Sequence, residues 1–135
     1  MPKLFNIGAS TGKAGPKHSS MDKRQIGLKA EEEAAHFLRA NGYEIKSRNW
    51  RWKRCEIDII AVKEDTLVFV EVKTRKNEDF GYPEEFLTEP QEERIHLAAE
   101  VYAEEINWVG GMRFDIIAIL QNAYPCHIEH LEDAF

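Results

Sequence analysis

Two short stretches of the sequence carry carboxylates at a spacing that could hold a metal ion. The first reads E-I-D-I-I-A at residues 56–61, and the second reads V-F-V-E-V-K-T-R at residues 68–75. Hard divalent cations prefer carboxylate oxygens, so Asp58 and Glu71 are candidate metal ligands. Lys73 comes next after Glu71 on the same strand face and adds a positive charge. The two stretches therefore predict a metal site at the mouth of a sheet.

The two stretches are expected to pair as an antiparallel hairpin through K-E-D-T at residues 63–66. A loop of two or four residues would place Asp58 directly opposite Glu71, whereas three or five residues would separate them. Opposed carboxylates repel each other, and a bound divalent cation would remove the repulsion. The alternative interpretation is that Glu and Lys at exposed strand ends serve only solubility. The expected pairs are Val62 with Leu67, Ile60 with Phe69, Asp58 with Glu71, and Glu56 with Lys73.

Alternation of side chains along each strand predicts which residues share a face. In the first strand, one face should carry Ile57, Ile59 and Ala61, and the other Glu56, Asp58, Ile60 and Val62. In the second strand, one face should carry Val68, Val70 and Val72, and the other Leu67, Phe69, Glu71, Lys73 and Arg75. The acids should therefore lie at the charged end of a largely apolar face.

A helix is predicted from Gly27 to Asn41, where apolar residues recur at helical spacing until an N-G stop signal. Glu31 falls on the inward stripe of this helix, and a buried carboxylate is costly unless it is paired or bound to a cation. Glu31 is therefore a candidate further acid of the site. Alternatively, it only favours the dipole of the first helical turn. The inward stripe is Ala34, Ala35 and Leu38, and the solvent side carries Glu32, His36 and Arg39.

Residues 46–54, K-S-R-N-W-R-W-K-R, hold five basic and no acidic side chains. They fall on a strand predicted from Tyr43 to Trp52. Basic side chains here could bind the phosphates of a nucleic acid, while Trp50 and Trp52 stack on sugars or bases. Alternatively, the tryptophans are half-buried strand residues. The candidate nucleic-acid-binding residues are Lys46, Arg48, Arg51, Lys53, Arg54 and Arg75.

The net charge of −6 alone argues against a nucleic-acid partner. The charge is unevenly distributed, however, since residues 77–111 hold ten acidic residues and one basic residue. No apolar run approaches the roughly 20 residues of a membrane span. The start of the chain also lacks the hydrophobic block of a signal peptide, so we expect a cytoplasmic protein without a membrane partner. Cys55 and Cys126 form neither a zinc pattern nor a disulfide framework.

The remaining elements predict a compact α/β sandwich. T-E-P-Q at residues 88–91 has the form of a helix capping box. The helix that follows has an acidic side and an apolar stripe, which is Ile95, Ala98, Ala99, Tyr102 and Ile106. A nearly all-apolar strand at residues 112–120 is expected inside the sheet. Asp115 within it either supports the metal site as an outer carboxylate or pairs with a nearby arginine, and we favour the structural role. The last eight residues, 128–135, predict a short edge strand.

At 135 residues, with 43% hydrophobic residues, the chain is long enough for one domain with its own core. Residues 1–25 are rich in Gly, Ser and Lys and predict a basic, flexible arm, which leaves 26–135 as the folded domain. G-A-S-T-G-K at residues 8–13 lacks the spacing of a phosphate loop. His127 and His130 are expected to lie on the surface.

This order of elements, with an aspartate followed by E-x-K one hairpin later, resembles the PD-(D/E)xK, or restriction-endonuclease-like, nuclease superfamily. More closely, the chain resembles the YraN-like family of small bacterial proteins, described as predicted endonucleases related to archaeal Holliday-junction resolvases. The matching segments are G-L-K-A-E (27–31), N-G-Y (41–43), R-N-W-R (48–51), E-I-D-I-I-A (56–61), V-F-V-E-V-K-T-R (68–75), F-G-Y-P (80–83), R-F-D-I-I-A-I (113–119) and the terminal A-F.

The resemblance implies a three-layer sandwich with a helix-strand-strand-strand-helix-strand core around a mixed sheet. It also implies Asp58 and Glu71 as ligands of Mg²⁺ or Mn²⁺, Lys73 as the catalytic lysine, and Glu31 as a helix-borne acid. The substrate would be DNA rather than RNA, and branched or structured DNA by analogy. Symmetric cutting of a junction would require a homodimer.

The chain departs from the family pattern at two positions. Cys55 stands where the family usually has Gly, and Gln91 stands where a Lys is expected at the start of the second helix. If that Lys positions phosphate, its absence weakens activity, although Gln91 can still donate a hydrogen bond. The competing interpretation is a non-catalytic nucleic-acid-binding or assembly module that retains the nuclease fold.

Overall fold

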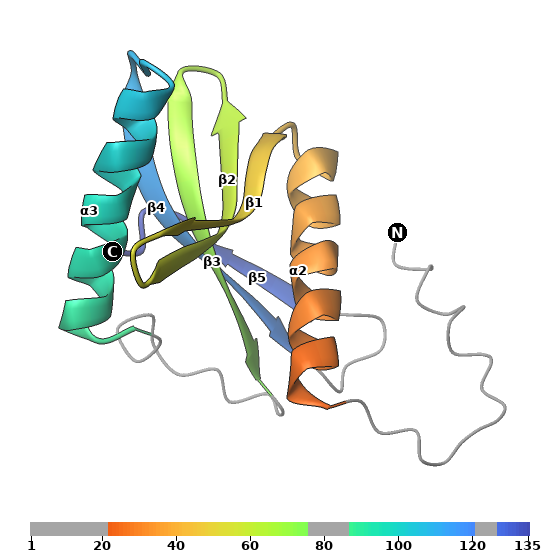
Figure 1. Cartoon of the computed structure of the whole chain (residues 1–135). Helices are drawn as coiled ribbons and strands as arrows, with labels where there is room; N and C mark the ends of the chain where they lie inside the picture. The colour runs from red at the N-terminus through yellow and green to blue at the C-terminus, as the bar shows by residue number, and fades with distance from the viewer. Residues whose placement is uncertain (1–21, 76–86, 121–126) are drawn as a thin grey trace, which may run out of the picture.

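The computed structural model describes residues 22–75, 87–120 and 127–135. In these residues a five-stranded mixed sheet lies between two helices that cover its opposite faces (Figure 1). The strands follow one another in chain order across the sheet; β3 and β4 are parallel and the other neighbours antiparallel. The elements are α2 (Lys23–Ala40), β1 (Glu44–Trp52), β2 (Cys55–Lys63), β3 (Thr66–Arg75), α3 (Glu89–Glu105), β4 (Gly111–Leu120) and β5 (His127–Leu131).

The predicted α/β sandwich is confirmed, including its order of helices and strands. β4 lies inside the sheet, and β5 adds the expected short edge strand. Three predictions fall outside the described residues: most of the N-terminal arm, the segment at 8–13 and the F-G-Y-P loop at 80–83. Of the helices in the described part of the chain, none combines the length and apolarity needed to cross a membrane.

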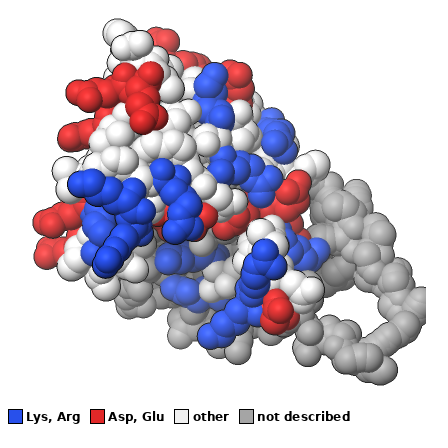
Figure 2. Space-filling view, viewed as in Figure 1, with Lys and Arg blue, Asp and Glu red and all other residues white. Residues whose placement is uncertain are grey.

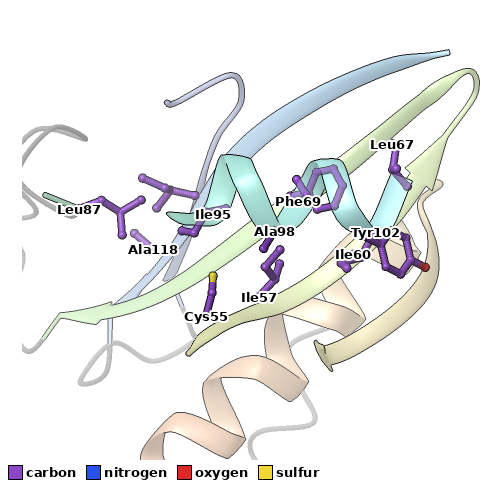
Figure 3. Packing of buried hydrophobic residues seen from close by; sticks show 12 residues of the cluster. Cys55, Ile57, Ile60, Leu67, Phe69, Leu87, Ile95, Ala98, Tyr102 and Ala118 are labelled. Atoms are coloured by element: carbon purple, nitrogen blue, oxygen red, sulfur yellow. The ribbon is translucent and has the colours of Figure 1, made fainter. Parts of the chain in front are cut away.

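Each helix buries its predicted apolar stripe against one face of the sheet, except for Ile106, which is the C-cap residue of α3 and is exposed. Figure 3 shows the α3 stripe packed over apolar side chains of β2 and β3, among them Phe69, which has no exposed surface. Truncating a side chain of this size to Ala in such a core typically costs about 3–5 kcal/mol. The buried stripe residues are Ala34, Ala35 and Leu38 of α2, and Ile95, Ala98, Ala99 and Tyr102 of α3.

α2 begins at Lys23, four residues before the predicted start at Gly27, so that prediction is wrong. The cause is a capping box at its N-terminus. The Asp22 carboxylate accepts a hydrogen bond from the Gln25 N–H at 2.9 Å, and the Gln25 side chain accepts one from the Asp22 N–H at 3.1 Å. Residues 23–25 therefore belong to the folded domain and not to the arm.

The predicted capping box of α3 is confirmed. Thr88 Oγ1 accepts a hydrogen bond from the Gln91 N–H at 3.3 Å, and Gln91 Oε1 accepts one from the Thr88 N–H at 2.8 Å. Gln91 therefore has a structural role at the position where the family resemblance predicts Lys. This contact satisfies N–H groups that the helix itself leaves without partners.

The β2–β3 hairpin has the predicted pairs Val62 with Leu67 and Ile60 with Phe69, whereas the predicted pairs Asp58 with Glu71 and Glu56 with Lys73 are not among its backbone pairs. Its loop is two residues long, Glu64 and Asp65, which is one of the lengths that keeps the acids in register. The last backbone pair away from the loop joins Ile59 to Val70, so Asp58 and Glu71 lie one residue beyond it. The paired residues are Ile59 with Val70, Ile60 with Phe69, Ala61 with Val68, Val62 with Leu67, and Lys63 with Thr66.

One predicted face assignment is wrong. Ile57 is predicted to share a face with Ile59, but it packs with Ile60 in the core under α3, whereas Ile59 packs in the core under α2. The change of face falls between Ile57 and Ile59, at Asp58, which together with Asn49 is left out of the β1–β2 pairs. Strict alternation assumes a regular backbone, which this ribbon lacks at that point.

Asp115 pairs with an arginine, as predicted. Its fully buried carboxylate accepts hydrogen bonds from Arg113 Nε at 2.9 Å and Nη2 at 2.8 Å, and from the Asp133 N–H at 3.0 Å. His130 Nε2 lies 2.8 Å from Asp115 Oδ2, and the His130 side chain is only 11% exposed. The surface prediction for His130 is therefore wrong, whereas His127 is exposed.

Candidate metal centre

Asp58 and Glu71 lie where the backbones of β2 and β3 stop pairing. Asp58 Oδ2 accepts a hydrogen bond from the Val72 N–H at 2.8 Å. The Glu71 side chain is nearly buried, with 9% of the residue exposed, and its Oε2 atom is buried without a hydrogen-bond partner. A buried carboxylate oxygen without a donor is unfavourable unless a cation compensates it.

The two acids hold their protons unusually strongly. The pKa of Glu71 is raised to about 8, first by burial and then by the charge of Asp58. The pKa of Asp58 is raised to about 7 by burial, which outweighs the hydrogen bond from the Val72 N–H. Lys73 acts in the opposite direction, since its positive charge lowers both pKa values. One lysine does not balance two buried carboxylates, whereas a divalent cation would.

The charge of Glu31 of α2 raises the pKa of both Asp58 and Glu71. Glu31 Oε1 accepts a hydrogen bond from Asn49 Nδ2 of β1 at 3.0 Å. Within 22–75, 87–120 and 127–135, however, no three His, Cys, Asp or Glu side chains form a group that could hold a metal ion. The candidate side-chain ligands are therefore two, Asp58 and Glu71.

Three of the predicted nucleic-acid-binding residues form ion pairs with nearby glutamates. These pairs are largely exposed, and such pairs contribute little stability, so they can open when a phosphate competes for the cation. The pairs join Lys46 Nζ to Glu44 at 3.7 Å, Arg48 Nη1 to Glu32 at 2.9 Å, and Arg51 Nη1 to Glu56 at 3.7 Å.

Basic side chains gather around the β1–β2 hairpin, with acidic side chains among them on the same face (Figure 2). Figure 2 shows Lys and Arg over the β1–β2 hairpin and between the two helices, and Asp and Glu along the outer side of α3. Arg54 at the hairpin tip is exposed. Lys53 Nζ beside it lies 4.8 Å from the centre of the Trp52 ring. The basic side chains of the tip are therefore available to a phosphate backbone.

The two tryptophans of β1 pack against the core under α3 rather than standing free. Both are partly buried, and the Trp50 ring meets Tyr102 of α3 edge to face with ring centres 5.2 Å apart. This packing favours the interpretation that Trp50 and Trp52 are half-buried strand residues. It leaves the phosphate contacts to the basic side chains between them.

Two residues near the acids received no role from the sequence. Asn49 bonds to Glu31, and its only sequence signal is an asparagine in the middle of a strand pattern, where that residue is disfavoured. Cys55 is buried in the core under α3, and burial followed by the charge of Glu71 raises the pKa of its thiol. The thiol therefore stays protonated and packs as a small apolar side chain.

Comparison with known proteins places the chain in a family. Residues 30–119 match the uncharacterised protein family UPF0102. The chain is 41% identical over 114 residues to a UPF0102 protein of Christiangramia forsetii, which covers 84% of this chain and 96% of the relative. It is 43% identical over 103 residues to a UPF0102 protein of Caldicellulosiruptor saccharolyticus, covering 76% and 87%. The chain belongs to the UPF0102 family.

Proposed function

We propose that this member of the UPF0102 family is a metal-dependent endonuclease that hydrolyses phosphodiester bonds in DNA. The observation that carries the proposal is the pair of buried acids, Asp58 and Glu71, with Lys73 beside them and one Glu71 oxygen without a donor. Purely structural buried carboxylates are normally satisfied by hydrogen bonds or ion pairs, as Asp115 is in this protein.

The residues present fit Mg²⁺ or Mn²⁺. Both ions prefer oxygen ligands and keep several waters, so a site with two carboxylates is sufficient. Asp58 and Glu71 would supply these carboxylates, and the backbone carbonyl of Val72 would add a third oxygen. When bound, the ion would polarise the scissile phosphate and lower the pKa of an attacking water.

The chain's own residues would perform the remaining tasks. Lys73 would orient the water or stabilise negative charge that develops on the phosphate. Glu31, held by Asn49, would organise the water shell or a second ion beside the acid pair. The basic residues of the β1–β2 hairpin, with Arg75 at the end of β3, would hold the backbone without reading sequence.

The proposal extends to the superfamily of the protein and to the kind of DNA that it cleaves. The order of helices and strands, and the position of the acids on one hairpin, support membership of the PD-(D/E)xK superfamily in its YraN-like branch. By analogy with that superfamily, we propose branched or structured DNA as the substrate. A homodimer would allow both strands of a junction to be cut symmetrically.

The direct test offers the protein a panel of duplex, flap, four-way-junction and single-stranded DNA and RNA with Mg²⁺ or Mn²⁺. Wild type should cleave at least one DNA, and Lys73→Ala should reduce cleavage at least 100-fold, as expected when an electrostatic contact to the reacting group is lost. Equal cleavage by both proteins would indicate a contaminating nuclease and remove support for the proposal.

A second candidate function is a non-catalytic module that binds nucleic acid. It is favoured by the finding that no third acidic, histidine or cysteine side chain joins Asp58 and Glu71 as a ligand group in the described residues. Calorimetry with Mn²⁺ separates the two functions. An endonuclease should take up Mn²⁺ in a way that Asp58→Asn abolishes, whereas a binding module should show no such uptake and still shift DNA in a salt-sensitive way.

A further inference from the structure

Asn49 has an unusual backbone conformation for its place in the fold. Its φ is +53°, in the left-handed region that asparagine tolerates better than most residues. Among the described residues, four other non-glycine residues have positive φ, and all of them lie in turns: Lys53, Glu64, Asn107 and Asp133. Asn49 instead lies in the middle of a strand, so the conformation is not required to reverse the chain.

Asn49 lies between side chains of β1 that reach opposite layers of the fold, and the β1–β2 register continues unchanged across it. Pairing of β1 with β2 passes from Arg48–Ile59 to Trp50–Ile57 and leaves out Asn49 and Asp58 between them. On one side of the break Arg48 reaches α2, and on the other side Trp50 packs under α3. Asp58 lies at the break itself, where its carboxylate turns to the Val72 N–H of β3.

The side chain of Asn49 makes a second contribution. Its Nδ2 donates a hydrogen bond to Glu31 Oε1 at 3.0 Å, and this contact is partly buried. The preceding residue, Arg48, binds the following glutamate, Glu32, at 2.9 Å. Two successive residues of β1 thus hold two successive glutamates of α2. The Asn49 contact holds Glu31, the glutamate whose charge raises the pKa of Asp58 and Glu71.

We infer that Asn49 is a positioning residue for the candidate metal centre. Its left-handed backbone lies opposite Asp58, at the position that the β1–β2 pairing leaves out, and its amide holds the Glu31 carboxylate of α2. Asn is suited to both tasks, because it tolerates positive φ and carries a donor that a carboxylate accepts. This inference rests on the proposed function, since it assigns a purpose to the placement of Glu31.

The test separates the side chain of Asn49 from its backbone. Asn49→Gly keeps positive φ accessible and removes only the amide. We expect it to retain the thermal unfolding midpoint of wild type and to raise the Kd for Mn²⁺ by about 10-fold, the usual effect of losing an outer partner of a metal site. Asn107→Gly is the matched control, because Asn107 also has positive φ but lies in the turn after α3. It should leave the Kd unchanged.

A double-mutant cycle shows whether Asn49 acts through Glu31. Asn49→Gly should have no further effect on the Mn²⁺ Kd in a Glu31→Ala protein. The inference is overturned if the 10-fold loss persists in that background, or if Asn49→Gly binds Mn²⁺ as wild type does. If Asn49→Gly does not fold, Asn49→Asp replaces it, since Asp also tolerates positive φ and would repel Glu31.

The role of Asn49 can also be tested if the protein does not bind metal. If wild type shows no Mn²⁺ uptake that depends on Asp58, the metal proposal fails, and NMR of the metal-free protein decides the role of Asn49. Its side-chain NH₂ group should exchange with water slowly in wild type and quickly in Glu31→Ala. Equal exchange in the two proteins would overturn the positioning role independently of any metal.

Discussion

Asp58 of β2 and Val72 of β3 are joined by a side chain where their backbones no longer pair. Asp58 Oδ2 accepts the hydrogen bond of the Val72 N–H at 2.8 Å, directly after the last backbone pair, Ile59 with Val70. One oxygen of the Asp58 carboxylate thus links β2 to β3 beyond their last backbone pair. The negative charge of the same carboxylate raises the pKa of Glu71. The fold therefore requires a hydrogen-bond acceptor at Asp58, whereas the proposed metal site requires its negative charge.

Asp58→Asn and Asp58→Ala should separate these demands. The Asn side-chain oxygen can still accept the Val72 N–H, so Asp58→Asn should unfold in urea at or above the wild-type midpoint, because a buried charge has been removed. Asp58→Ala leaves that N–H without its acceptor and should cost about 1–3 kcal/mol. Both variants should lose Mn²⁺ binding. Equal stability of the two variants would show that the Val72 contact contributes little.

The acid pair should make the metal-free protein less stable as the pH rises. The unfolded pKa values of Asp and Glu lie near 4, and in the folded protein those of Asp58 and Glu71 are about 7 and about 8. The folded state therefore binds more protons between these limits. The stabilising contribution is complete below about pH 4 and is lost as the pH rises to about 8. Urea unfolding at several pH values, in the presence of EDTA, measures it.

Asp58→Asn and Glu71→Gln are the matched variants for this pH dependence. Each should lose less stability than wild type between pH 5 and pH 8. Mn²⁺ should restore more stability at pH 8 than at pH 6, because binding must displace fewer protons at the higher pH. An identical pH profile for wild type and the double variant would contradict the raised pKa values.

Asp115 should contribute more to stability than any acid of the candidate metal centre. Burial alone would raise its pKa, but contacts from His130, Arg113 and the Asp133 N–H outweigh burial and lower it. Asp115→Ala removes the buried carboxylate that binds the Arg113 guanidinium, leaving it Tyr43 and Glu132, and should cost about 3–5 kcal/mol. Urea unfolding at pH 7 measures this loss, and a cost below about 1 kcal/mol would contradict a structural role.

The parts of the fold set by regular patterns could be predicted from the sequence. Period-2 and period-3.6 apolar patterns gave the strands, the buried stripes of both helices and the register of the β2–β3 hairpin. These patterns depend on local backbone regularity, so they fail where the regularity fails. The faces of β2 change at Asp58, and the prediction for Ile57 is wrong for that reason.

Contacts between distant segments could not be predicted. Nothing in the pattern of β5 indicates that His130 meets Asp115, because that contact depends on the order of strands in the sheet. In the same way, the sequence suggests Glu31 as an inward acid but not its bond to Asn49, which joins α2 to a strand 18 residues later. The candidate acids were predictable as residue types, and the residue that holds one of them was not.

Gln91→Lys tests the departure from the family pattern. The substitution removes the side-chain acceptor of the Thr88 N–H and should lower the free energy of unfolding by about 0.5–1.5 kcal/mol. If a Lys at this position binds phosphate, cleavage of DNA should nevertheless become faster. Thr88→Ala is the control, since it removes the other half of the same capping box without adding charge. Faster cleavage by both variants would attribute the gain to a looser helix end rather than to the lysine.

The salt dependence of DNA binding should identify the basic surface. Lys53 and Arg54 are exposed at the tip of the β1–β2 hairpin, and replacing each with Ala should reduce the slope of log K against log salt by about 1. Fluorescence anisotropy with a duplex, without divalent metal, measures the slope independently of cleavage. Arg39→Ala is the matched control, because Arg39 is equally exposed but lies in the last turn of α2. If all three substitutions reduce the slope equally, binding follows overall charge. If only the hairpin substitutions do, the phosphates lie along the hairpin that carries Asp58.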